Sequence, residues 1–197
     1  MRVRQFPSHL ANQGLVQRGD ISELRNLRIG IDAVYWLRSI QALKDPLAAA
    51  LGGVPPGLTG YVEREAHVWR SHELNPVWVF QGVTPVSPHQ MFQTQAASMG
   101  RAWEQIAGGQ QQAASMSFAL ATSRINSEVV HEVQCNLRQN GAECFIAPYF
   151  AGPQLAHFAK EGFVHAVFGQ HGLLLYGIQR VITSIDFQQG TFEWVCL

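Results

Sequence analysis

The 197-residue sequence predicts an α/β fold in which a mostly parallel central sheet is flanked by helices. Short apolar runs alternate with longer segments whose apolar residues recur every three or four positions, the pattern of strands connected by amphipathic helices. Residues 27–31 and 33–40 show both patterns in direct succession, with Asp32 between them. The last two apolar runs are joined by Gln-Gln-Gly, which predicts a terminal hairpin.

The composition indicates one globular domain over residues 1–197 with few charges. Only 14% of the residues are charged and the formal net charge is zero. Such a balance gives no electrostatic support for a broad nucleic-acid-binding surface. The densest group of arginines lies in the first thirty residues, and it supplies the candidates for direct RNA binding: Arg2, Arg4, Arg25 and Arg28.

Cellular location is predicted from cysteine usage and from hydropathy. The three cysteines form no C-x-x-C spacing, which favours a reducing compartment. No apolar run approaches the length of a membrane span, and the N-terminus lacks the apolar region of a signal peptide. We therefore expect a cytoplasmic protein without membrane contact.

The first half of the chain predicts two strands and two helices. A strand over 27–31 leads into a helix over 33–40, and the sequence DPLAAALGGVPPG at 45–57 indicates a loop because of its glycines and prolines. A helix follows from residue 58 to about 70. The apolar run 77–80 predicts a buried parallel strand that ends at Gln81.

Residues 84–124 predict a helical insertion. Phe92, Met99 and Trp103 lie on one stripe of an amphipathic helix that ends near the sequence AGGQQQ, and a second apolar segment covers 113–122. Two interpretations of the stripe remain open. In the favoured interpretation the stripe packs into a small core. In the other it forms a groove that binds a partner, and these three residues are then the candidate contact residues.

The remaining chain predicts a helix from residue 126 that stops at Asn140 and Gly141, a strand over 143–148 and a helix over 153–162. Strands are expected at 164–168 and 173–177, followed by the hairpin of 180–187 and 191–197. The chain ends on the apolar sequence WVCL, which suggests a fragment of a longer protein.

Four blocks in this order resemble the flap-endonuclease (XPG) family, whose fold is PIN-like. They are IGIDAVYWL, VWVFQGVTP, NGAECFIAPYFAGPQLAHF and VHAVFGQHGLLLYG. Active members hold two divalent metal ions with carboxylates at several strand ends. The resemblance implies that only Asp32 is kept here, while other positions have lost their acids; these are Gln81, Phe150, Gly152, Gln170 and Gly172.

The resemblance therefore implies a pseudo-nuclease with no catalytic residues, metal ion or cofactor. The insertion supports this, because it occupies the place of the family's basic arch and is nearly uncharged. Asp32 is expected to be a vestige that caps the following helix rather than a metal ligand. Histidine spacing does not fit a helical zinc pair.

Within this superfamily the sequence is most similar to the Mkt-type (maintenance-of-killer-toxin) proteins, through IDAVYWL, the loop DPLAAALGGVPPGL and AVFGQHGLLLY. That resemblance implies a scaffold that regulates mRNA stability and translation through protein-protein interaction. Its partners would be an ataxin-type protein associated with the poly(A)-binding protein, other mRNA regulators and its own C-terminal domain. RNA contact would be indirect, in the cytoplasm and in RNA granules.

Two alternatives remain. The first is a divergent nuclease that holds one metal ion with Asp32 and recruited groups such as Asp186 or Glu143. The second is a module that binds RNA directly through the N-terminal arginines.

Overall fold

The computed structural model describes residues 6–40, 43, 50–51, 53–83, 88–121 and 125–196. Arg2, Arg4 and residues 45–49 and 52 of the loop 45–57 lie outside these residues. The centre of the fold is a seven-stranded sheet with the order β1-β7-β6-β5-β2-β3-β4. Its strands are β1 (Val16–Asp20), β2 (Arg28–Asp32), β3 (Asn75–Phe80), β4 (Glu143–Ile146), β5 (Ala166–Phe168), β6 (Arg180–Asp186) and β7 (Thr191–Cys196).

The strand directions confirm the predicted fold class. The five adjacent strands β4, β3, β2, β5 and β6 are mutually parallel. Strand β7 returns antiparallel to β6 as the expected hairpin, and β1 runs antiparallel to β7. The helices of the body are α1 (Phe6–Asn12), α2 (Ala33–Ser39), α4 (Leu58–Ser71), α7 (Ser127–Gln139) and α8 (Ala151–Lys160). Two 3-10 turns complete it: η1 (Ile21–Leu24) and η3 (His171–Tyr176).

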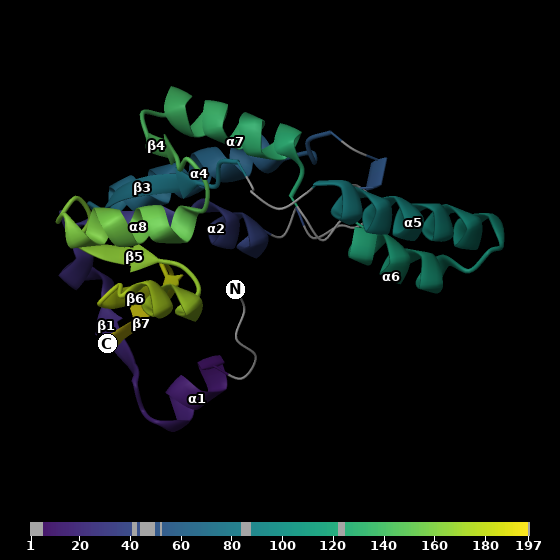
Figure 1. Cartoon of the computed structure of the whole chain (residues 1–197). Helices are drawn as coiled ribbons and strands as arrows, with labels where there is room; N and C mark the ends of the chain where they lie inside the picture. Colours follow the sequence, from purple (N-terminus) through teal and green to yellow (C-terminus); the bar gives the residue numbers. More distant parts are fainter. Residues whose placement is uncertain are drawn as a thin grey trace.

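Helices cover both faces of the sheet (Figure 1). Successive strand residues point to opposite faces, so Trp78 and Phe80 join a core with α2, α4 and α7, while Val77 and Val79 join a second core with α8 and η3. Leu155 of α8 is completely buried in that second core. Burial on both faces explains why β3 is a continuous apolar run.

Three tryptophans dominate the first core. Trp78 meets Trp36 and Trp69 edge-on, with ring centroids 5.9 and 6.2 Å apart. All three rings are almost fully buried. Edge-to-face pairs of this kind stabilise a core beyond the area that they bury, so this cluster anchors α2 and α4 to the sheet.

The insertion is a helical hairpin of α5 (Pro88–Ala107) and α6 (Gln111–Ala121) that projects from the body (Figure 1). It has a small core of Ala102, Ala114 and Phe118, and Met99 packs against it. Trp103 meets Phe118 edge-on at 4.9 Å. The expected helix of this region and the second apolar segment are thus confirmed as two packed helices.

Three expectations about secondary structure need correction. The strand predicted at 173–177 is the 3-10 turn η3, in which Leu173 and Leu174 are buried and Leu175 is exposed. Both α1 and β1 were missed. β1 has the polar sequence VQRGD because it is an edge strand with little buried surface. Within the described residues, none of the helices is both long enough and apolar enough to cross a membrane.

Candidate functional site

The candidate site lies where the parallel strands β2, β3 and β5 end. These strands are neighbours in the sheet, so Asp32, Gln81 and Gly169 follow at the same edge. The helix α8 begins beside them after β4. In open α/β sheets this edge is where ligands commonly bind, so the topology alone makes it the first place to look for chemistry.

Asp32 is the acidic residue at this edge, and it caps α2. Its Oδ1 accepts hydrogen bonds from the backbone N–H groups of Val34 and Tyr35, both at 3.1 Å. The side chain is only 8% exposed. Burial raises the pKa of Asp32, and the two backbone hydrogen bonds oppose that increase. The expected capping role is confirmed by this geometry.

Leu173 fills the space beside Asp32. A Cβ atom placed on Gly169 would lie 2.4 Å from Leu173 Cδ1 and 3.2 Å from Asp32 Cβ. A Cβ atom on Gly152 would lie 3.4 Å from Leu173 Cδ2 and 2.9 Å from Tyr176 Cε2. Leu173 itself is 1% exposed. An apolar side chain therefore lies at this edge, where Gly169 leaves room for Leu173 and Gly152 leaves room for Tyr176.

Gln81 is an exposed residue at a point where two backbones come very close. The N–H of Gly82 donates to the carbonyl of Tyr149 at 2.8 Å, and the N–H of Ala147 donates to the carbonyl of Phe80 at 2.9 Å. A Cβ atom on Gly82 would lie 1.9 Å from the carbonyl oxygen of Ala147. Backbone packing therefore requires the glycine that follows Gln81.

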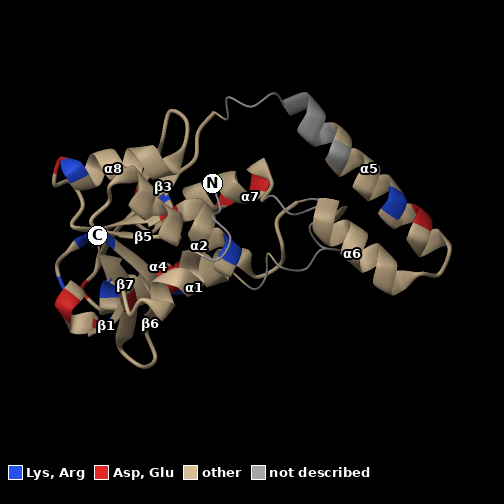
Figure 2. Cartoon of the chain, turned by 60° about the horizontal axis from the view of Figure 1, so that its bottom comes forward, with Lys and Arg blue, Asp and Glu red and all other residues tan. Residues whose placement is uncertain are grey.

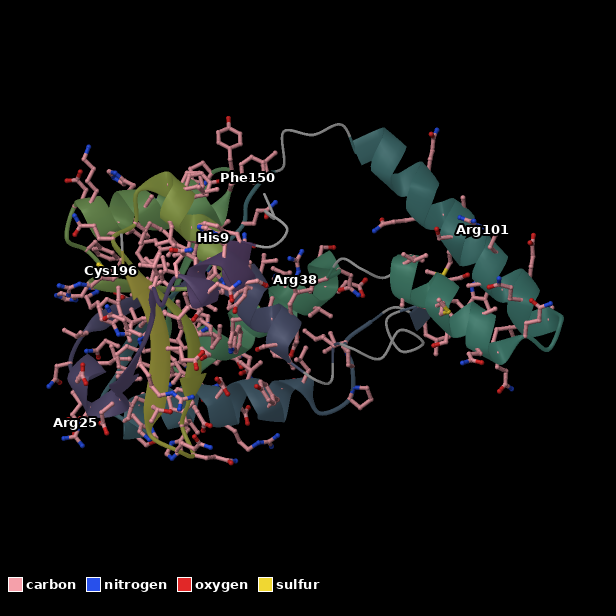
Figure 3. The ribbon with its side chains drawn as sticks, turned by 90° about the horizontal axis from the view of Figure 1, so that it is seen from below. His9, Arg25, Arg38, Arg101, Phe150 and Cys196 are labelled. Atoms are coloured by element: carbon pink, nitrogen blue, oxygen red, sulfur yellow. The ribbon has the colours of Figure 1, made fainter. Side chains whose placement is uncertain are left out.

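The other predicted positions lie on the surface or in η3. Phe150 is the N-cap residue of α8 without a side-chain cap bond, is 41% exposed, and lies at the outside of the body (Figure 3). The carbonyl of Gln170 accepts a hydrogen bond from the N–H of Leu173 at 3.0 Å, and Gly172 is in the first turn of η3. Burial lowers the pKa of the neighbouring His171, so its ring is neutral at pH 7.

No three His, Cys, Asp or Glu residues come together as a metal-binding group in the described part of the chain. The acids that could help Asp32 in a divergent nuclease are placed elsewhere. Glu143 is the first residue of β4, so it lies at the amino ends of the parallel strands, whereas Asp32 lies at their carboxyl ends. Glu143 forms an ion pair with Arg28 at 2.5 Å. Asp186 accepts hydrogen bonds from Gln188 and Gln189 in the β6–β7 turn.

The described arginines among the RNA-binding candidates are engaged with carboxylates. Arg25 lies 3.9 Å from Glu73, and Arg28, besides its pair with Glu143, stacks on the ring of Phe163 at 4.0 Å. Such pairs reduce the positive charge that these residues offer to a phosphate backbone.

The partner-binding candidates divide between core and surface. Met99 packs into the hairpin core, whereas Trp103 packs on Phe118 with one side and is 43% exposed. Phe92 lies in α5, but its side chain is outside the described residues. Sequence reasoning missed Leu173 and Tyr176 as residues of the site, although the apolar sequence LLLY after Gly172 was a usable signal.

Two of the curated proteins that are similar in sequence to this chain are post-transcriptional regulators. No family model matches the chain. The post-transcriptional regulator MKT1 of Cryptococcus neoformans is 27% identical over 99% of the chain, and mkt1 of Schizosaccharomyces pombe is 22% identical over 94%. This chain is similar to the Mkt-type regulators and has a PIN-like nuclease fold. It spans 27% of the length of each of these two relatives.

Solved nucleases share the fold of this chain. The catalytic core of Rad2 in complex with DNA superposes with a TM-score of 0.67 over 99% of this chain and 53% of that one, at 16% identity. Human GEN1 in complex with Holliday junction DNA gives 0.65 over 99% and 44%, at 19% identity. In sequence, flap endonuclease 1 of Methanocella arvoryzae is 28% identical over 87% of the domain and 53% of the enzyme.

Proposed function

We propose that this domain is a catalytically inactive nuclease fold that serves as a scaffold in the post-transcriptional regulation of mRNA, through protein-protein interaction. Two sets of facts support the proposal. Similarity over 99% and 94% of this chain connects it with proteins named as post-transcriptional regulators. The edge of the sheet where the related nucleases carry out their chemistry holds a buried leucine instead of a group of acids.

The position of Leu173 is the observation that carries the proposal. Two hard divalent cations need oxygen ligands from several directions. Around Leu173 the chain offers the carboxylate of Asp32, which already accepts two backbone hydrogen bonds, and the glycines 152 and 169. An acidic side chain at Gly169 would collide with Leu173, and one at Gly152 would collide with the ring of Tyr176, unless the turn η3 moved. This packing therefore leaves no room for the acids of a metal centre.

The hairpin of α5 and α6 is the surface that we propose for protein partners. Its outer side presents Met116 and Leu120, each 70% exposed and one helical turn apart on α6. Trp103 and Ile106 of α5 are 43% and 41% exposed. Figure 2 shows few charged residues on these helices. Exposed apolar groups gathered on a projecting, weakly charged element are typical of a protein-binding surface.

The identity of the partners rests on the resemblance alone. It leads us to propose an ataxin-type protein associated with the poly(A)-binding protein, other mRNA regulators, and further domains of the same polypeptide. It also leads us to propose a cytoplasmic location that includes RNA granules. RNA would then be reached through these partners.

Inactivity can be tested with metal ions. We expect that titration with magnesium or manganese in a calorimeter gives no saturable heat in the micromolar range, because Leu173 and the glycines leave Asp32 without companion ligands. We also expect no cleavage of a flap substrate or of single-stranded RNA. The flap endonuclease of Methanocella arvoryzae, assayed in parallel, should be active.

Asp32→Asn is the matched variant for this experiment. The amide keeps the Oδ1 acceptor for α2 and removes a carboxylate whose pKa burial raises, so its melting temperature at neutral pH should be unchanged or higher. Saturable metal binding together with cleavage that Asp32→Asn abolishes would establish the divergent nuclease instead.

The interaction surface can be tested with a double variant of α6. Met116→Ser combined with Leu120→Ser should leave the melting temperature within a few degrees of the unmodified protein, because both side chains are exposed. Capture of an ataxin-type partner should fall about tenfold or more. Gln112→Ser, an exposed change on the same helix, is the control. Equal capture by all three proteins would remove the hairpin as the partner surface.

A further inference from the structure

A cavity of about 690 Å³ lies at the amino ends of β5 and β6. Its walls come from the last turn of α8, the connection from α8 to β5 and the segment that leads into β6. Strands β2, β5 and β6 are parallel, and Asp32 lies at the carboxyl end of β2. The cavity and Asp32 are therefore at opposite ends of the strands. No role in the proposed scaffold function requires this cavity.

The polar side chains of the cavity are all basic or neutral. Lys160 and Arg180 line it together with the imidazoles of His157 and His165, and no aspartate or glutamate is among its lining residues. Neither Lys160 nor Arg180 lies within 4.0 Å of a carboxylate in the described residues. The arginines of β1 and β2, by contrast, each pair with a glutamate. Glu161 comes within 4.0 Å of His157, so Lys160 and Arg180 are the cations of the cavity that have no carboxylate within that distance in the described residues.

His165 is held in one orientation. Its ring Nδ1 accepts a hydrogen bond from the backbone N–H of Arg28 at 3.0 Å, and the backbone N–H of His165 donates to the carbonyl of Arg28 at 2.8 Å. With Nδ1 acting as the acceptor, the neutral ring carries its hydrogen on Nε2. His165 thus adds a fixed hydrogen-bond donor to the two cations.

Stabilisation of α8 explains only part of this arrangement. Lys160 and His157 occupy the last turn of α8, where positive groups interact favourably with the helix dipole. Arg180 belongs to β6, and that interaction does not account for it. The remaining wall is partly apolar and includes Ala156 and Tyr176. Cations from separate elements that converge beside an apolar wall are the arrangement of a site for an anion with an apolar part.

We propose that this cavity binds a small phosphorylated molecule, such as a nucleoside monophosphate. The phosphate lies between Lys160 and Arg180, because a guanidinium and an ammonium together satisfy its oxygens with charge-assisted hydrogen bonds. The rest of the ligand packs on the wall with Ala156 and Tyr176. The volume is that of a site for one small ligand, within the usual range of roughly 300–1,000 Å³.

Calorimetry at low ionic strength tests the proposal, with AMP, ribose 5-phosphate and pyrophosphate as phosphorylated probes and adenosine as the matched compound without phosphate. We expect at least one phosphorylated probe to bind with a Kd below about 1 mM, and adenosine to bind at least about tenfold more weakly than AMP. Arg180→Met and Lys160→Met should each weaken the binding about tenfold. Added salt should weaken it as well.

Arg64→Met is the control, because Arg64 is an exposed arginine on α4 that does not line the cavity. It should bind the probes like the unmodified protein. Thermal unfolding shows that each variant is folded. The proposal is overturned if none of the phosphorylated probes binds, if adenosine and AMP bind equally, or if folded Arg180→Met and Lys160→Met proteins bind like Arg64→Met.

Discussion

Gly82→Ala is expected to destabilise the domain by at least about 3 kcal/mol in urea-induced unfolding. The added methyl group would lie 1.9 Å from the carbonyl oxygen of Ala147, and 2.8 Å from that of Pro148. Both are backbone atoms of the segment that follows β4. They cannot move without breaking the hydrogen bonds from Gly82 to Tyr149 and from Ala147 to Phe80.

Gly60→Ala is the matched control for this change. Gly60 lies inside α4, and an added methyl group would meet only the guanidinium of Arg64, at 3.5 Å. Alanine is the better helix former by about 1 kcal/mol, so this variant should be as stable as the unmodified domain or more stable. If both variants lost similar amounts of stability, the backbone at Gly82 would not be packed tightly against the backbone at Ala147.

Leu173→Ala should lower the free energy of unfolding by about 2 to 5 kcal/mol. Leu173 is 1% exposed and contacts the positions of Gly152 and Gly169, which come from different elements. Its removal would leave a void that the two glycines cannot fill, because they have no side chains to move into it. The measurement is again urea-induced unfolding, with the slope of the transition checked for a two-state fit.

Leu175→Ala is the control for Leu173→Ala. Leu175 is on the same 3-10 turn and is 57% exposed, so its loss should change the free energy of unfolding by no more than about 0.5 kcal/mol. Equal effects for the two leucines would contradict the idea that Leu173 is the packing centre beside Asp32, and would weaken the proposed function with it.

Local periodicity was sufficient to predict most of the fold. β2 and β3 are buried on both faces and α4 and α7 each have one buried stripe, so their sequences carry the pattern of their environment. β1 carries no such pattern because it is an edge strand with a polar sequence. η3 was mistaken for a strand because four apolar residues in a row fit either structure until their packing is known.

The candidate site was predicted only in part. The capping role of Asp32 follows from its place between a strand and a helix, which is local information. The filling of the site by Leu173 and Tyr176 depends on Gly169 and Gly152 respectively, and only the folded chain brings these residues together. The cavity with Lys160 and Arg180 also joins separate elements, so spacing in the sequence could not reveal it.

The antiparallel pairing of β1 with β7 constrains how the domain can be made. Val16 lies opposite Val195, so the first strand of the sheet finds its hydrogen-bonding partner in the strand that is synthesised last. During synthesis, β1 cannot form its sheet hydrogen bonds until all the other strands of the sheet have emerged from the ribosome. Contacts so distant in sequence form slowly, and exposed strand edges attract other chains. The nascent domain is therefore most vulnerable to aggregation just before its synthesis reaches β7.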